Sequence, residues 1–193
     1  MVKQKNAIIS NIPNTLTLCN LICGILGIIS LFSSAYMFFS IFIFLSMLFD
    51  FMDGFAARVL YVKSEIGKQL DSLSDMVSFG VAPGLLMYKI LKVSLPPNYS
   101  ELSFVAMAIP LSSALRLAKF NIDVRQSENF IGLPTPATAL FFISLPFIYF
   151  NYSSIGLISS DFLKMLFINP VFLIISILVI SFLMISELSF VSM

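Results

Sequence analysis

A long stretch without charge limits the folds that are open to this chain. No charged residue occurs from Asn6 to Phe49, and a helix needs about 20 apolar residues to cross the hydrocarbon core of a bilayer. The stretch is long enough for two membrane-spanning helices, with a natural break near Ser33 and Ser34. The sequence therefore predicts an all-α membrane protein rather than a soluble domain.

Four further segments have the length and the apolar character of membrane spans. They cover roughly residues 71–91, 102–120, 132–151 and 162–186. Pro110 and Pro146 fall inside two of them and are expected to kink those helices, which a bundle tolerates when neighbouring groups bind the freed carbonyls. Since no linker or internal repeat interrupts the pattern, we predict a bundle of six transmembrane helices that forms one domain over residues 1–193.

Basic residues are shared unevenly between the two ends of this predicted bundle. One end receives the N-terminus and the loops after the second and fourth spans, and cytoplasmic loops carry the excess of Lys and Arg. That end collects Lys3, Lys5, Arg58, Lys63, Lys68, Arg116, Lys119 and Arg125, against Lys89, Lys92 and Lys164 at the other. We therefore expect a multi-pass protein of the inner cell membrane with its N-terminus in the cytoplasm. The net charge of +1 gives no reason to expect a nucleic-acid partner.

Two residue types narrow the chemistry. The chain has no histidine, which removes the commonest general base and the commonest zinc ligand. Cys19 and Cys23 would share one face of the first span, but neither has a histidine or a further cysteine near it, so we expect them to pack rather than to bind metal or form a disulfide. Acid–base chemistry must then use other side chains, carboxylates among them.

Four aspartates stand where a membrane protein rarely places them: Asp50, Asp53, Asp71 and Asp75. An aspartate at the centre of a membrane helix costs roughly 2.5–3.5 kcal/mol on insertion scales, so each is a candidate functional residue. The second and third spans run in opposite directions, which brings the two pairs to the same depth, and each pair shares a helix face. All-oxygen sites suit Mg²⁺ or Mn²⁺. The sequence predicts a metal site here.

Small residues and an arginine accompany these acids. Gly54, Ala57 and Gly67 thin the helix surfaces beside the aspartates, and Arg58 ends the segment with a forked donor suited to phosphate. Together they favour a phosphorylated ligand. A cation or proton transporter is the alternative from another class, because intramembrane acids also line ion pathways.

The segment Asp50-x2-Asp53-Gly54-x2-Ala57-Arg58-x8-Gly67-x3-Asp71-x3-Asp75 resembles the signature of the CDP-alcohol phosphatidyltransferase family at every position. The resemblance implies a six-helix membrane bundle, usually homodimeric, that transfers a phosphatidyl group from a CDP-linked lipid to an alcohol and releases CMP. It implies that the four aspartates bind two divalent ions and that Asp75 is the general base. It also implies a nucleotide-facing set of Gly54, Ala57, Arg58, Gly67 and Asp71.

Four other segments resemble the phosphatidylserine synthase branch of that family, in which Arg usually stands where this chain has Lys119. They are residues 12–17 with Asn20, residues 72–80, residues 114–121 and residues 130–137. This branch would use CDP-diacylglycerol and L-serine as substrates in phospholipid biosynthesis; glycerol 3-phosphate and an inositol phosphate are the alternative acceptors. The candidate acceptor-binding residues are Arg116, Lys119, Asn121 and Ser78.

Several of these residues have a second interpretation. The basic residues near position 116 could simply follow the positive-inside rule. Thr15, Thr17 and Asn20 could line the nucleotide pocket or bond between helices. Gly80 and Gly84 are expected to allow close helix packing.

Overall fold

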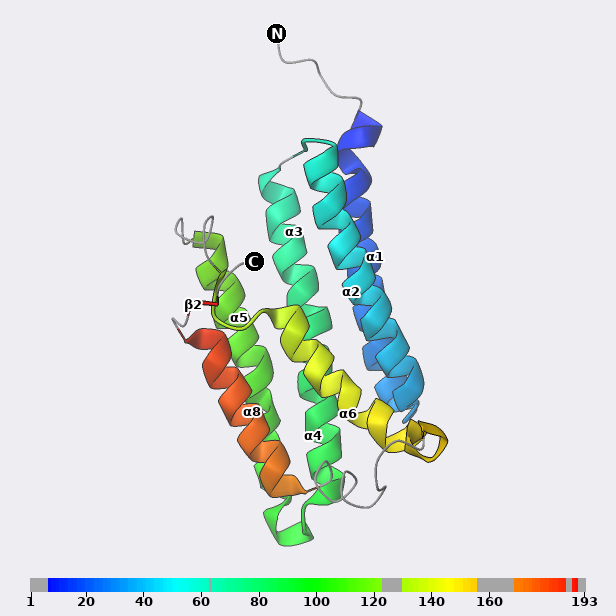
Figure 1. The fold of residues 1–193 in the computed structure, drawn as a ribbon, viewed down its shortest axis with the longest axis vertical. Helices are drawn as coiled ribbons and strands as arrows, with labels where there is room; N and C mark the ends of the chain where they lie inside the picture. The colour runs from blue at the N-terminus through cyan, green and yellow to red at the C-terminus, as the bar shows by residue number, and fades with distance from the viewer. Residues whose placement is uncertain (1–6, 63, 123–129, 156–168, 187–188, 191–193) are drawn as a thin grey trace.

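The computed structural model describes residues 7–62, 64–122, 130–155, 169–186 and 189–190, and these form a bundle of helices (Figure 1). The first two helices are α1 (Ala7–Phe32) and α2 (Tyr36–Val59). They pack side by side as an antiparallel pair, and the turn between them has a positive φ of 55° at Ser34. The break predicted near Ser33 and Ser34 is therefore confirmed.

A lysine from another helix holds this turn. Lys89 donates from Nζ to the backbone carbonyl of Leu31, at the end of α1, and to Ser34 Oγ over 3.0 Å. The same ammonium lies over the ring of Tyr36, 5.3 Å from its centroid. A cation at the carbonyl end of a helix is favourable, so this charge has partners where the bundle is otherwise apolar.

The third helical stretch runs without a break from Glu65 to Ser94. It comprises α3 (Glu65–Asp75), a π-helical segment η1 (Met76–Val81) and α4 (Ala82–Ser94). The stretch begins six residues before the predicted Asp71, because Ser64 caps it by accepting a 2.9 Å hydrogen bond from the Gly67 amide. Single π-turns inside helices often occur at functional sites, and this one follows directly on Asp75.

The remaining elements complete the bundle. They are η2 (Pro97–Met107), α5 (Ala108–Ile122), α6 (Thr135–Ile155) and α8 (Pro170–Ile185), with β1 (Phe130–Ile131) and β2 (Ser189–Phe190) paired antiparallel. The fifth predicted span started three residues too early, because Gly132 has a φ of 77° and the helix begins only at Thr135. Asn169 caps α8 at Val171 and Phe172. The predicted start of the last span at residue 162 lies outside the described residues.

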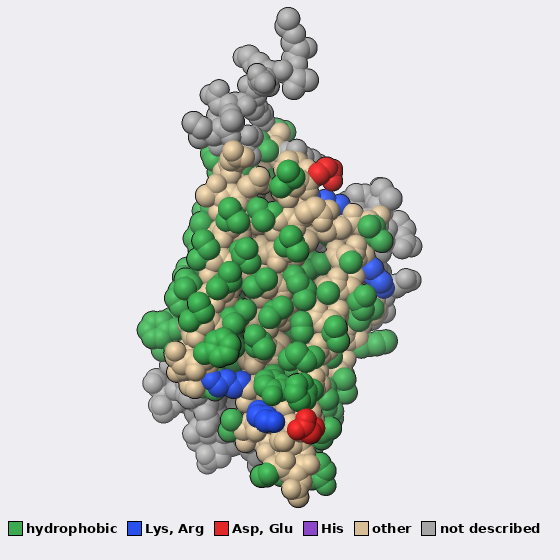
Figure 2. All heavy atoms as spheres, turned by 180° about the vertical axis from the view of Figure 1, so that it is seen from behind, with side chains coloured by type: hydrophobic (Ala, Val, Ile, Leu, Met, Phe, Trp, Pro, Cys, Tyr) green, Lys and Arg blue, Asp and Glu red, His purple; other side chains and the backbone are tan. Residues whose placement is uncertain are grey.

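The described residues fit a membrane protein. Four stretches are long and apolar enough to cross a bilayer: Asn11–Phe32, Tyr36–Val59, Glu65–Ser94 and Pro97–Ile122. Thr135–Leu145 and Pro170–Ile185 are shorter apolar helices. On the face seen in Figure 2, apolar side chains cover the middle of the molecule, and charged side chains gather toward the two ends. Such a surface suits lipid contact and would be unusual in water.

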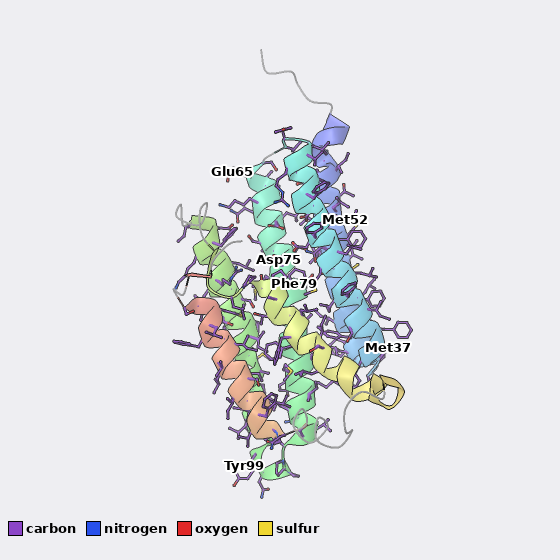
Figure 3. All side chains as sticks on the ribbon, in the orientation of Figure 1. Met37, Met52, Glu65, Asp75, Phe79 and Tyr99 are labelled. Atoms are coloured by element: carbon purple, nitrogen blue, oxygen red, sulfur yellow. The ribbon has the colours of Figure 1, made fainter. Side chains whose placement is uncertain are left out.

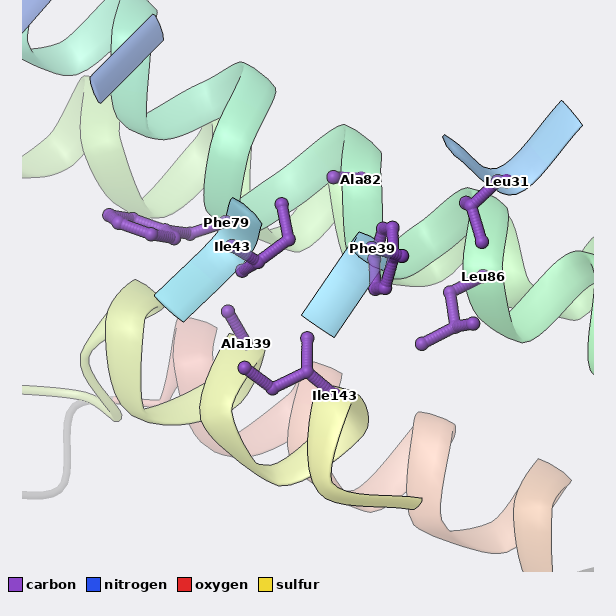
Figure 4. Close-up of a cluster of buried hydrophobic side chains, with 8 residues drawn as sticks. All are labelled: Leu31, Phe39, Ile43, Phe79, Ala82, Leu86, Ala139 and Ile143. Carbon is purple, nitrogen blue, oxygen red and sulfur yellow. The ribbon is translucent and has the colours of Figure 1, made fainter. Parts of the chain in front are cut away.

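Two buried apolar clusters hold the helices together. The first joins α1, α2, η1, α4 and α6 (Figure 4) through Leu31, Phe39, Ile43, Phe79, Ala82, Leu86, Ala139 and Ile143. The second joins α4, η2, α5, α6 and α8 through Met87, Leu91, Ala106, Ile109, Phe142, Leu145, Leu173 and Ile177. Gly84 lets α4 approach Pro110 of α5, since a Cβ there would lie 2.7 Å from the proline ring. The close packing expected of Gly84 is therefore confirmed.

Candidate active site

Three of the four aspartates converge between α2 and α3. Asp50, Asp53 and Asp71 each offer a carboxylate oxygen, and these oxygens all lie within 4.8 Å of one another. A single hard cation bound at 2.0–2.6 Å from each oxygen fits this spacing. The prediction that antiparallel helices bring these acids together is confirmed for the three.

Asp75 lies beside this group rather than within it. Its side chain is buried and within hydrogen-bonding distance of the Asp50 carboxyl group. It sits at the end of α3, where the π-helical turn begins, in the middle of the bundle (Figure 3). Asp75 is therefore a buried carboxyl group beside the cluster, at the point where the helix changes to π-helical geometry.

Helix α1 supplies hydrogen bonds to two of the carboxylates. Thr17 donates from Oγ1 to Asp53 Oδ2 over 2.5 Å, and Asn20 donates from Nδ2 to Asp75 Oδ1 over 3.3 Å. Ser46 in turn donates to Asn20 Oδ1, while Ser78 donates to the Asn20 backbone carbonyl over 3.3 Å. Because Ser46 holds the amide oxygen, the amide nitrogen of Asn20 faces Asp75. Both carboxylates are thus fixed in orientation by buried neighbours.

A cavity of about 590 Å³ opens beside the cluster. Asp50, Asp53 and Asp71 line it together with Gly54, Ala57 and Gly67, so most of the predicted nucleotide-facing residues meet in one place. Arg58 is exposed, and its Nε donates to the Gly54 carbonyl over 3.1 Å. Thr17 also lines the cavity. The expected bond between helices is confirmed for Thr17, which donates to Asp53 of α2, while its place at the nucleotide stays a prediction.

The glycines in this cavity differ in what they allow. A Cβ on Gly67 would lie 2.8 Å from Ser64 Oγ and 2.9 Å from Asn14 Oδ1, so protein packing explains that glycine. A Cβ on Gly54 would meet no atom of the described residues within 4 Å. Glycine inside a helix costs about 1 kcal/mol relative to alanine. Since packing does not require Gly54, its small size leaves room for a ligand.

Lys68 is a cavity residue that the sequence analysis counted only as a loop charge. It lies three positions before Asp71, and this spacing on one helix face was the available signal. Its Nζ donates to the Asn121 backbone carbonyl over 2.8 Å, so it joins α3 to the end of α5 at the mouth of the cavity.

The four candidate acceptor-binding residues are placed differently from one another. Arg116 is 8% exposed, and its charge interacts with that of Asp75. Lys119 is exposed and points to the Ile185 carbonyl at the end of α8, 3.5 Å away. Asn121 donates to Ser72 over 2.8 Å, and Ser78 is buried against α1, where it bonds to Asn20. Ser78 belongs to the π-helical turn itself, whereas Arg116 is a buried cation on α5, which packs against that turn.

Comparisons with known proteins point to one enzyme family. A family model described as CDP-alcohol phosphatidyltransferase matches residues 10–183. The chain is 39% identical over 142 residues to a CDP-diacylglycerol–serine O-phosphatidyltransferase of Bacillus subtilis, covering 72% of this chain and 76% of that protein. It is 40% identical over 136 residues to a protein of the same name from Methanocaldococcus jannaschii, covering 70% and 60%. An archaetidylserine synthase of Methanothermobacter thermautotrophicus is 36% identical over 132 residues, with 67% and 54% covered. The chain thus spans little more than half the length of the two archaeal relatives.

Proposed function

The chain belongs to the CDP-alcohol phosphatidyltransferase family, and from that premise we propose that it transfers the phosphatidyl group of CDP-diacylglycerol to the hydroxyl of L-serine. The products are phosphatidylserine and CMP. The observation that carries the proposal is the cavity in which three carboxylates converge and in which Gly54 leaves space that no atom of the described residues fills.

The donor set fits divalent cations. Three carboxylate oxygens within 4.8 Å of one another form an all-oxygen site, and Asp75 adds a fourth carboxylate beside Asp50. We propose that Asp50, Asp53, Asp71 and Asp75 hold two ions, Mg²⁺ or Mn²⁺. When bound, such ions neutralise the pyrophosphate and stabilise the departing CMP.

The chain's own residues supply the rest of the reaction. Gly54, Ala57, Gly67 and Asp71 bind the nucleotide in the cavity, with Arg58 at its edge. Asp75 takes the proton of the acceptor hydroxyl. The hydroxyl oxygen then forms a bond to the phosphorus that carries the diacylglycerol, and the bond from that phosphorus to CMP breaks. Asn20 and Ser46 keep Asp75 in position, and the cavity holds the two substrates together.

Serine is favoured as the acceptor by two facts. Relatives from a bacterium and an archaeon carry the name CDP-diacylglycerol–serine O-phosphatidyltransferase. Arg116 is a buried cation whose charge interacts with that of Asp75, and a serine carboxylate requires a cationic partner. We propose that Arg116 binds this carboxylate, with Lys119, Asn121 and Ser78 as further candidates. Glycerol 3-phosphate or an inositol phosphate would bring about two negative charges and need a denser set of cations.

CMP release by the purified protein tests the proposal. The protein is given CDP-diacylglycerol, Mg²⁺ or Mn²⁺, and each acceptor in turn. Release that depends on L-serine supports the whole proposal, whereas release with glycerol 3-phosphate or an inositol phosphate retains the chemistry and rejects serine. Ion flux in vesicles without CMP release would instead favour the transporter.

We further propose that the membrane domain has six spans and forms a homodimer in the inner cell membrane, with its N-terminus and active site facing the cytoplasm. The uneven distribution of Lys and Arg supports this orientation. Labelling of single cysteines introduced at Tyr61 and Tyr99, in intact cells and in inverted vesicles, tests it. The cysteine of Tyr61→Cys should react only in inverted vesicles, and the cysteine of Tyr99→Cys should react in intact cells. The reverse pattern would reject the orientation.

Gly54→Ala is expected to separate stability from activity. Its Cβ meets no protein atom, so the helix should gain about 1 kcal/mol in free energy of unfolding. The same methyl group enters the cavity, so the KM for CDP-diacylglycerol should rise roughly tenfold to a hundredfold. Thermal unfolding and initial rates measure the two effects. An unchanged KM would show that Gly54 does not face the nucleotide lipid.

Arg116→Ala is expected to raise the KM for L-serine more than the KM for CDP-diacylglycerol, by about tenfold or more, because a hydrogen bond to a charged group is lost. Arg116→Lys keeps the charge but not the fork, and it should recover part of the loss. Equal increases in both KM values would assign Arg116 to folding or to phosphate binding instead.

A further inference from the structure

Four buried side-chain polar atoms, Asn121 Oδ1 and Ser181 Oγ among them, have no hydrogen-bond partner among the residues that the structure describes, and the other two lie at the depth of Asp75. These two are Arg116 Nε on α5 and Thr135 Oγ1 at the start of α6. Thr135 is 1% exposed and Arg116 is 8% exposed, so bulk water does not solvate either group. A buried polar atom without a partner costs about 1–3 kcal/mol. Such an atom in a native structure calls for an explanation, and a missing ligand is one.

The packing of α6 places Thr135 at the depth of Asp75. Ala139 of α6 and Phe79 of η1 belong to the same buried cluster, in which the two elements pack together (Figure 4). The two elements run in the same direction (Figure 1). Thr135 precedes Ala139 by four residues, and Asp75 precedes Phe79 by four. Thr135 and Asp75 therefore each lie about one turn before this packed pair, toward the N-terminal end of their element.

Arg116 reaches the same depth from α5. A Cβ on Gly80 would lie 3.0 Å from the Ser113 Cβ, so these two residues are level with one another. Arg116 follows Ser113 by three residues on a helix that runs opposite to η1, which brings it alongside the end of α3 (Figure 1). Three elements therefore present Asp75, Arg116 and Thr135 at one level.

The chemistry of this group suits an anion. Arg116 carries a positive charge, and the Thr135 hydroxyl can donate a hydrogen bond. Thr135 is also the first residue of the 21-residue helix α6, whose N-terminal end favours negative charge. The other three aspartates, Asp50, Asp53 and Asp71, form the carboxylate cluster next to Asp75, where an anion would be repelled unless cations intervene.

We infer that the Thr135 hydroxyl is a specificity-determining contact that binds the anionic group of the acceptor alcohol together with Arg116. This inference rests on the proposed function, and it adds a residue to the acceptor side of the site. The anionic group is the carboxylate if the acceptor is serine and the phosphate if it is a phosphorylated alcohol. Its hydroxyl end then lies at Asp75.

The test compares Thr135→Val with two other variants of the full chain. Thr135→Val removes the hydroxyl and keeps the shape, and Thr135→Ser keeps the hydroxyl. Thr138→Val is the matched control, because Thr138 is equally buried on the same helix but donates to the Pro134 carbonyl over 3.3 Å. For each protein, KM is measured separately for acceptor and CDP-diacylglycerol, and thermal unfolding is recorded.

Thr135→Val should raise the KM for L-serine about tenfold or more, with the KM for CDP-diacylglycerol within about twofold. Its unfolding temperature should stay the same or rise, because an unpartnered buried hydroxyl is removed. Thr135→Ser should restore the KM, and Thr138→Val should leave it unchanged. Equal effects of the two valine variants, or equal changes in both KM values, would overturn the inference.

Failure of the proposed function gives a different result. If the wild-type protein releases CMP only with glycerol 3-phosphate, serine is rejected, and the same three variants test the contact with that acceptor. If no acceptor supports release, calorimetry on the CMP-bound protein measures the binding of L-serine and of glycerol 3-phosphate. Weaker binding in Thr135→Val but not in Thr138→Val upholds the contact, and no difference rejects it.

Discussion

Asp75→Asn should reduce kcat for CMP release by about 10²–10⁴-fold, the usual contribution of a general base. The amide has the shape of the carboxylate, and its oxygen can still accept the hydrogen bond from Asn20 Nδ2. The nitrogen of asparagine cannot take the proton of the acceptor hydroxyl. Bound CMP should therefore be retained, which calorimetry with CMP can show.

The metal must be controlled in this experiment, because Asp75 is also a proposed ligand. Asp53→Asn is the comparison, since Asp53 belongs to the three converging carboxylates and has no proposed role as a base. Saturating Mn²⁺ should restore much of the activity of Asp53→Asn and little of that of Asp75→Asn. Full recovery of Asp75→Asn at high Mn²⁺ would leave Asp75 as a ligand alone.

The arrangement of the acids could be predicted from the sequence because it depends on local geometry. Asp50 and Asp53 are three residues apart, Asp71 follows after one short loop, and antiparallel helices bring such pairs to one depth. The break at Ser33 and Ser34 was equally plain, because an uncharged stretch of that length exceeds one span. Both predictions needed only the spacing along the chain.

The supporting contacts depend on tertiary packing and could not be predicted in this way. Nothing in the apolar pattern shows the extra residue per turn that makes Met76–Val81 a π-helical segment. Asn20 has an ordinary place near the start of the first span, and its contacts with Ser46 and Asp75 involve residues 26 and 55 positions away. The burial of Thr135 likewise depends on how α6 packs against η1.

The position of Lys119 shows that the sequence identifies a basic residue but not whether its side chain is buried. Lys119 lies three residues after Arg116 and was predicted with it as an acceptor-binding candidate, yet it is exposed and faces the end of α8. Helical spacing shows which residues share a face, but it does not show which face the neighbouring helices enclose. Burial separates the two cations.

Removal of divalent cations should abolish CMP release completely, and added Mg²⁺ or Mn²⁺ should restore it. The proposed ions carry the charge compensation of four carboxylates and a pyrophosphate, and no general base can replace that contribution. The protein is treated with a chelator, passed through a desalting column and assayed at increasing Mn²⁺. Binding of Mn²⁺ is followed in parallel by electron paramagnetic resonance without substrate. Full activity in metal-free protein would reject the metal site.

Thr17→Val gives this prediction a structural test. Thr17 donates to Asp53 Oδ2 over 2.5 Å, and loss of a hydrogen bond to a metal ligand typically weakens metal binding about 10–100-fold. Thr15→Val is the matched control, since Thr15 lies on the same helix but is exposed and donates to the Asn11 carbonyl over 3.0 Å. Weaker Mn²⁺ binding in Thr17→Val but not in Thr15→Val would support Asp53 as a metal ligand. An equal effect in both variants would instead reflect a general change in α1, and Asp53 would lose its support as a ligand.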